Sequence, residues 1–154
     1  MAEARRSEGE KRGEEPMWLQ DAGYRLAADT GVWKRPDFGG IPYSDGDETE
    51  ERLLSIVRSA SDLSIFSPEL QALCTDWPSL YHFGKSRANV LRPFERHLTG
   101  AEVLEVGAGC GAITRYLGEV GARVTALEGS IRRASIARAR TKDLRNRSEE
   151  HTSE

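Results

Sequence analysis

The fold is decided by residues 103–128, which read VLEVGAGCGAITRYLGEVGARVTALE. The stretch opens with four residues whose apolar character and flanking glycines predict a buried strand of a parallel sheet. Apolar residues at helical spacing follow, and the helix that they predict ends at Gly121. A second apolar run at 124–127 predicts another strand, and 131–140 predict another helix. Residues 101–140 therefore predict a β-α-β-α order, the N-terminal part of a doubly wound, Rossmann-like α/β sheet.

A glycine-rich turn, with glycines at 107, 109 and 111, joins the first predicted strand to the first helix. Glycine adopts positive φ without strain and lets the backbone approach a ligand, and the N–H groups of the following helix point to the same place. Glu128 ends the second strand, 21 residues after Gly107, where a carboxylate accepts hydrogen bonds from ribose hydroxyls. The combination predicts a site for an adenosine-containing ligand. The expected binding residues are Gly107, Ala108, Gly109, Gly111 and Glu128. A tight turn that holds no ligand is the alternative.

Two classes of adenosine ligand fit this turn. The spacing Gly107-x-Gly109-x-x-Ala112 satisfies the fingerprint of a dinucleotide-binding turn, which allows NAD. Glu105 favours the other class, because it lies at the carboxyl end of an apolar strand, two residues before the first glycine. A carboxylate there repels a pyrophosphate but attracts the ammonium group of a methionine moiety. We therefore expect S-adenosylmethionine (SAM) and include Glu105 among its binding residues.

Residues 103–128 resemble the cofactor-binding half of the class I SAM-dependent methyltransferases. The resemblance implies that the loop from Glu105 to Gly111 wraps the methionine end of SAM, and that Glu128 holds the ribose. It also implies an enzyme that transfers a methyl group to an acceptor. Tyr81, which precedes the helix predicted near Ser86, is included among the cofactor-binding residues because it could close over the cofactor, with packing at the helix entry as the alternative.

Three upstream segments are similar to a bacterial subgroup of that family linked to glycosyltransferases of surface-polysaccharide pathways. They are residues 42–48 (PYSDGDE), 76–83 (DWPSLYHF) and 87–93 (RANVLRP). The resemblance covers roughly residues 42–144. It implies a small-molecule acceptor, with a sugar or glycan precursor as the leading class, and a glycosyltransferase as partner.

Two other functions stay open. One is an NAD-dependent oxidoreductase, and the other is a non-catalytic module whose helical leader binds a partner. The family's sheet has seven strands, of which only two are predicted here, so we assign no catalytic residue. The substrate pocket is expected beyond Asn146.

The final eight residues, 147–154 (RSEEHTSE), match the translation of a common sequencing-adapter oligonucleotide, so we expect a non-native tail there. An ordinary charged C-terminal tail is the alternative. With two strands and open sheet edges, the chain is expected to be a fragment that is unstable and inactive.

The rest of the chain divides into an arm and a leader. Residues 1–43 are expected to be disordered or irregular. The first 16 are almost all polar or small, and the aromatic residues that follow show neither helical nor strand periodicity. Residues 44–99 form a helical leader, and 100–146 form the partial SAM-binding domain.

Within the leader, the patterns predict three helices. One covers about 47–61 with Asp45 or Asp47 as N-cap. A short second helix begins at Ser67-Pro68, with Leu70, Leu73 and Cys74 facing inward, and the segment 76–79 ends it. A third begins near Ser86 and is broken near Arg92 by Pro93.

Composition excludes several classes of protein. The 154 residues carry a formal net charge of −3, which argues against binding a phosphate backbone, and no apolar stretch reaches the length of a membrane span. Two cysteines make no disulfide framework, which favours the cytoplasm, and the three histidines have no metal-ligand spacing.

Other reactive side chains are assigned ordinary roles. We expect Cys110 to fill the glycine turn rather than act as a nucleophile. Arg87 is expected to be a solvated helix arginine rather than the partner of the methionine carboxylate, and the basic residues at 132–145 a solvated helix face. His82 is assigned either to packing at the helix entry or to closure over the cofactor.

Overall fold

The computed structural model describes residues 17–144 and 150–151, and it confirms the β-α-β-α order predicted for 101–140. The four elements are β3 (Glu102–Val106), α6 (Ala112–Glu119), β4 (Arg123–Leu127) and α7 (Ile131–Arg140). β3 and β4 pair in parallel, with Val103 opposite Val124. The C-terminus of α6 is the predicted left-handed cap, because Gly121 has φ +87° and the N–H of Ala122 bonds back to the carbonyl of Leu117 (3.0 Å).

The strands form one mixed sheet in the order β1-β2-β5-β4-β3. β1 (Arg25–Ala27) and β2 (Val32–Lys34) are an antiparallel hairpin. The two-residue strand β5 (Glu150–His151) pairs in parallel with both β2 and β4. This strand belongs to the segment that we expected to be a non-native tail, and it lies where a third parallel strand of a doubly wound sheet would be. β3 pairs only with β4 among the described strands, so the expected open edge is present. The prediction of a buried strand is wrong here, because Leu104 and Val106 are exposed.

The arm is more regular than its sequence indicates. Residues 17–43, which we expected to be irregular, include α1 (Met17–Asp21) and the β1–β2 hairpin, with Trp33 buried. Each of these strands has three residues, too few to produce a readable alternation. Residues 1–16, where we expected disorder, lie outside the described residues.

The leader contains one helix that the sequence analysis missed. α2 (Asp47–Ser59) and α3 (Pro68–Leu73) lie where predicted, although Gly46 is the N-cap of α2 and Leu73 is exposed. The segment 76–79, which we took to end a helix, instead begins α4 (Trp77–Phe83). Asp76 and Ser79 form a capping box there, and Pro78 is accommodated because the first turn of a helix does not need its N–H.

The predicted break at Pro93 divides the last part of the leader into short pieces. They are two 3₁₀ helices, η1 (Lys85–Val90) and η2 (Arg92–Phe94), followed by α5 (Glu95–Leu98). In this broken segment Val90 and Phe94 are exposed, whereas Ala88 is buried.

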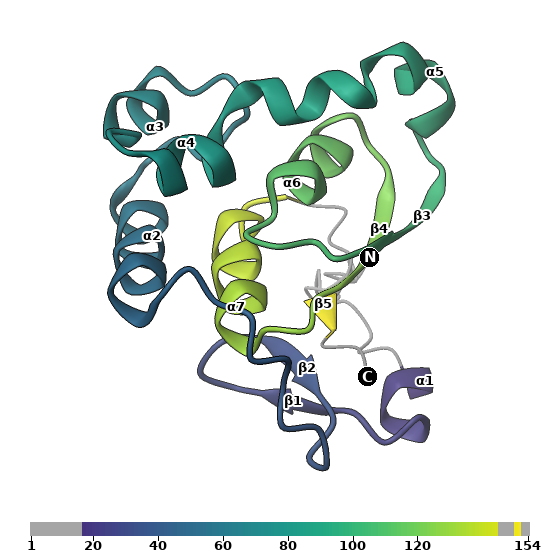
Figure 1. Ribbon diagram of the computed structural model, residues 1–154. Helices are drawn as coiled ribbons and strands as arrows, with labels where there is room; N and C mark the ends of the chain where they lie inside the picture. Colours follow the sequence, from purple (N-terminus) through teal and green to yellow (C-terminus); the bar gives the residue numbers. More distant parts are fainter. Residues whose placement is uncertain (1–16, 145–149, 152–154) are drawn as a thin grey trace, which may run out of the picture.

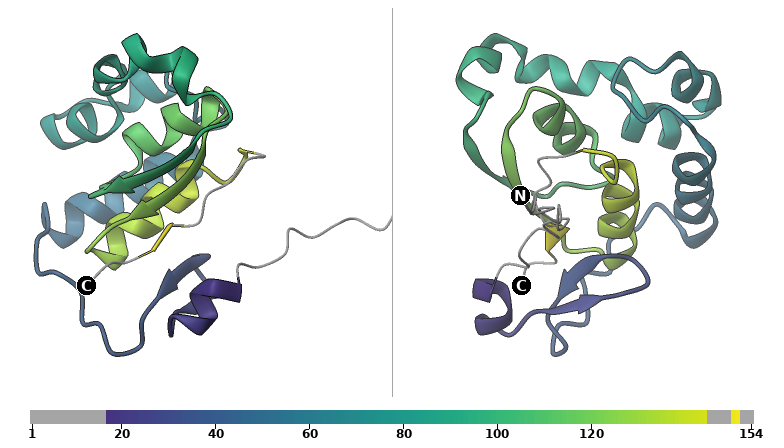
Figure 2. Two further views of the ribbon diagram at one scale, coloured as in Figure 1. Left: turned by 90° about the vertical axis from the view of Figure 1, so that its right-hand side faces the viewer. Right: turned by 180° about the vertical axis from the view of Figure 1, so that it is seen from behind.

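The molecule is layered (Figures 1 and 2). Helices α6 and α7 lie between the strand pair β3–β4 and the leader helix α2, with α3 and α4 beside α2. One buried cluster joins side chains of α2, α3 and α4 to Cys110 of the glycine turn and Ile136 of α7. The leader and the predicted SAM-binding part therefore share a core. This core is larger than two strands alone would supply, so we expect a folded chain in place of the unstable fragment that the strand count predicts. No helix in the described part of the chain has the length and apolar character to cross a membrane.

Candidate functional site

The glycine-rich turn has the backbone that its sequence predicts. Gly107, Gly109 and Gly111 have φ angles of +76°, +60° and +77°, a region that other residues adopt only with strain. A Cβ added to Gly107 or Gly109 would meet no atom within 4 Å, so an outside molecule can approach the backbone at both positions. A Cβ at Gly111 would lie 2.9 Å from the Cα of Ala137. Gly111 therefore permits α6 and α7 to pack closely and supports the turn from behind.

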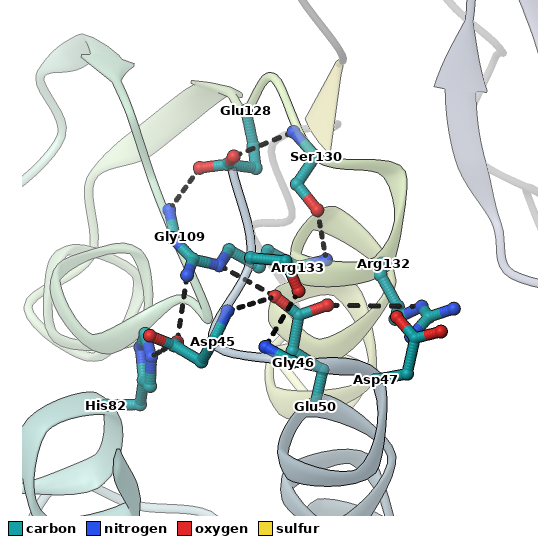
Figure 3. Close-up of polar contacts among 11 residues, drawn as sticks. Asp45, Gly46, Asp47, Glu50, His82, Gly109, Glu128, Ser130, Arg132 and Arg133 are labelled. Atoms are coloured by element: carbon teal, nitrogen blue, oxygen red, sulfur yellow. Dashed lines mark hydrogen bonds and ion pairs between the residues drawn. The ribbon is translucent and has the colours of Figure 1, made fainter. Parts of the chain in front are cut away.

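Glu128 holds this turn to the start of α7. Its carboxylate accepts hydrogen bonds from the N–H of Gly109 (2.7 Å) and from the N–H of Ser130 (2.8 Å) (Figure 3). The side chain is buried. Each oxygen retains a further lone pair, so the carboxylate can accept more hydrogen bonds in this position.

A pocket of about 440 Å³ opens between the turn, the end of β4 and the leader, a volume within the usual range for small-molecule sites. It brings together five predicted binding residues: Tyr81, Gly107, Ala108, Gly109 and Glu128. Gly111 and Glu105 are not in its lining. The other lining residues come from the arm, the leader, the glycine turn with its flanking elements, and the start of α7: Ile41, Tyr43, His82, Arg87, Val106, Cys110, Ala112, Gly129, Ser130 and Arg133.

Glu105 is turned toward α6. It accepts a hydrogen bond from the hydroxyl of Thr114 (2.7 Å). Burial, with the nearby Glu128 charge as a smaller cause, raises its pKa from 4.5 to about 7, although the Thr114 hydroxyl opposes the rise. Its contact with a cationic ligand group stays a prediction.

A network of charged side chains forms the wall of the pocket on the leader side (Figure 3). Arg133 donates from Nη2 to Asp45 (2.8 Å) and from Nε to Glu50 (3.1 Å). The same Asp45 oxygen lies 2.7 Å from Nε2 of His82. Burial lowers the pKa of His82, while Asp45 opposes this shift. His82 and Arg133 line the pocket, and Asp45 and Glu50 lie behind them and compensate the charge of Arg133.

The sequence analysis missed most of this wall. We assigned the basic residues at 132–145 to a solvated face, which is wrong for Arg133 and Arg140, since both are buried. We also took Asp45 for an N-cap, whereas it pairs with Arg133, 88 residues away. The acidic run that begins at Asp45 was a signal for a basic partner, but nothing local identifies that partner.

Arg87 lies over the ring of Tyr81, with its guanidinium carbon 4.3 Å from the ring centroid. It is exposed, as expected, but it also lines the pocket. It forms no ion pair with any carboxylate of residues 17–144. Unlike Arg133, it is a pocket cation that pairs with no anion among the described residues.

The remaining candidate chemistry is limited. Cys110 is buried, and burial raises the pKa of its thiol to about 12, so its thiolate is scarce at neutral pH, as expected of a filler of the turn. Within the described residues, no group of three or more His, Cys, Asp or Glu side chains could hold a metal ion.

Comparison with known proteins assigns no family or function to the chain. A comparison with models of protein families and a comparison with curated proteins both give no match to the chain.

Proposed function

We propose that the pocket binds SAM and that the chain is the cofactor-binding part of a methyltransferase. The observation that carries the proposal is the Glu128 carboxylate, which is bonded to the N–H of Gly109 inside the turn. In a dinucleotide site the pyrophosphate occupies such a turn and uses its N–H groups. Here the N–H groups of Gly107 and Ala108 are bonded to the carbonyl of Leu127 (2.8 and 3.0 Å), and the N–H of Gly109 is bonded to the negatively charged Glu128. The turn therefore disfavours a diphosphate and suits a ligand that is neutral or cationic near it.

The chain's residues fit the parts of SAM in turn. Glu128 has acceptor capacity left for two ribose hydroxyls, and the open faces of Gly107 and Gly109 permit close approach. Arg87 can pair with the methionine carboxylate, because a guanidinium binds a carboxylate with two parallel hydrogen bonds. Tyr81, held under Arg87, would border the same end of the ligand. Glu105 would face the ammonium group after a small rotation away from Thr114.

When bound, SAM supplies an electrophilic methyl group on its sulfonium. The contribution of these residues is to hold and orient the cofactor, since methyl transfer in line needs positioning above all. The described part of the chain is assigned no residue that moves a proton in the reaction.

The test is a titration of the chain with S-adenosylhomocysteine (SAH) and with NADH, each by calorimetry and then in competition. We expect SAH to bind and NADH not to displace it. Tighter binding of NADH, or binding of neither, would reject the proposal.

A variant links this binding to Glu128. Glu128→Gln removes the charge and one acceptor, so SAH affinity is expected to fall about 10- to 150-fold, the effect of about 1.5–3 kcal/mol for hydrogen bonds to a charged group. The matched control is Glu102→Gln, which changes an exposed carboxylate of β3 that pairs with Arg123 at 3.3 Å. Its SAH affinity should equal that of the unmodified chain.

A further inference from the structure

A second hollow adjoins the pocket on the side of α4 and η1. Its volume is about 560 Å³, and it shares Tyr81 and Arg87 with the first pocket. The other lining residues are Gln71, Trp77, Leu80, Gly84, Lys85 and Ser86. A molecule seated there would therefore lie next to the methionine end of a cofactor held as proposed above.

The hollow is cationic without internal compensation. Its lining includes Lys85 and Arg87 but no carboxylate. Neither side chain forms an ion pair with an acidic residue in the described part of the chain. The acidic residue that begins α4, Asp76, is outside the lining and pairs with Arg52. The electrostatics of the hollow thus favour an anionic ligand.

Its floor is apolar and aromatic. Trp77 is 75% exposed, and Leu80 and Tyr81 on the same helix are also exposed. The rings of Trp77 and Tyr81 lie with centroids 6.1 Å apart and at 38° to each other. Aromatic rings exposed side by side offer a surface on which a flat ring stacks.

Local structure fixes these groups in place. The capping box of Asp76 and Ser79 sets the start of α4, directly before Trp77. At the other end, a Cβ on Gly84 would clash with the carbonyl of Leu80, so glycine is required where the chain turns from α4 into η1. That turn places Lys85 and Arg87 beside the aromatic side chains of α4.

We propose that this hollow, rather than a pocket beyond Asn146 as the resemblance implied, binds the methyl acceptor, and that the acceptor carries a flat ring and an anionic group. The inference rests on the proposed function, because it depends on SAM in the adjoining pocket. When Arg87 pairs with the methionine carboxylate, Lys85, which lines only this hollow, is the cation left for the acceptor's anion, and phosphate and carboxylate both satisfy its ammonium group. The proposal therefore specifies a flat ring and a negative charge on the acceptor, but not which anionic group carries the charge.

The test uses two pairs of probes on the chain saturated with SAH. Uridine monophosphate is compared with uridine, and 4-hydroxybenzoate with 4-hydroxybenzyl alcohol, by calorimetry or ligand-observed NMR. We expect at least one anion to bind about 10-fold or more tightly than its neutral counterpart. The pair that shows the difference identifies the anion as phosphate or carboxylate. Equal affinity within both pairs, or no binding of any probe, would overturn the inference.

Two variants test whether the anionic probe binds in this hollow. Trp77→Ala and Lys85→Ala should each weaken the anionic probe about 5- to 20-fold and leave SAH affinity within twofold. Lys34→Ala, which removes an exposed lysine of β2, is the control and should change neither affinity. Probe binding that both site variants leave unchanged would overturn the inference while the proposed cofactor site stands. Failure of SAH itself to bind would reject the proposed function, and this inference with it.

Discussion

The two ends of α7 each bury an arginine, and the two arginines differ in what surrounds them. Arg133, in the first turn, donates to Asp45 and Glu50 of the leader. Arg140, in the last turn, donates from Nη1 to the carbonyl of His82 (2.9 Å), but its Nε and Nη2 have no hydrogen-bond partner within the described residues. Its guanidinium lies over the ring of Phe83, and burial, with the nearby Arg115 charge, lowers its pKa to about 10.

The comparison separates the effect of burial from the effect of partners. Both guanidinium groups are removed from water, but only Arg133 gains two carboxylates in exchange. A buried charge that pairs with opposite charges on another element links the two elements. A buried charge that has no such partner lowers the stability of the fold. The first end of α7 therefore connects the leader to the pocket, and the second end tolerates an unfavourable group.

The largest expected effect comes from Arg133→Met. The change removes the hydrogen-bonded cation of the buried Glu50 and leaves Asp45 with His82 alone, and breaking a buried pair in this way costs about 3–5 kcal/mol. In a small α/β unit this loss is expected to abolish the cooperative thermal transition followed by circular dichroism. Arg132→Met is the matched control. Arg132 is about half exposed and pairs with the exposed Asp47 at 2.6 Å and, more distantly, with Glu50 at 3.9 Å, so its loss should lower stability by less than about 1 kcal/mol. Equal effects of the two changes would refute the comparison.

A carboxylate offers a similar comparison: Glu105 is half-buried, and its hydrogen-bond partner is the Thr114 hydroxyl rather than an arginine. Its pKa is raised to about 7, so the folded state favours the protonated form. Stability is therefore lost as the pH rises from about 4.5 to 7. Glu105→Gln should remove this loss, and the variant should gain on the order of 1–3 kcal/mol over the unmodified chain at pH 8 and almost nothing at pH 4.5. Thermal melts at several pH values measure it, and a gain that does not depend on pH would contradict the assignment.

A smaller effect is expected for Arg140→Met. Methionine relieves the desolvated charge but loses the bond to the His82 carbonyl, and the two effects oppose each other. The net change should lie within about 1 kcal/mol of zero, far below that of Arg133→Met, although Arg140 is the more deeply buried of the two. A loss of stability as large as that of Arg133→Met would show that the burial of the arginine, and not its partners, determines the effect of removing it.

The smallest effect is expected from deletion of residues 147–154. The strand β5 contributes two residues to the sheet and pairs at Trp33, Ala126 and Leu127. Its removal should change the melting temperature by only a few degrees, corresponding to less than about 1 kcal/mol. A larger loss would mean that this segment is a structural strand of the fold rather than a dispensable tail.

Features with short-range causes were predictable from the sequence. The strand, turn and helix around Gly107, and the position of Glu128, depend on residues next to them. The pocket wall was not predictable, because the pairing of Asp45 with Arg133 spans 88 residues and that of Asp45 with His82 spans 37. Helix α4 was missed for another reason. Trp77-Pro78 signals a helix end as well as a helix start, and the choice depends on whether Asp76 caps the following turn.

The two hydrogen bonds that hold the Glu128 carboxylate have a consequence for recognition. Because Gly109 and Ser130 already fix both of its oxygens, an arriving sugar ring would find its acceptor preorganised. The Glu128 side chain would lose little rotamer entropy when a ligand binds. More of the energy of its contacts with the ligand would therefore appear as affinity. The turn that shapes the pocket would in this way also set how tightly the pocket binds.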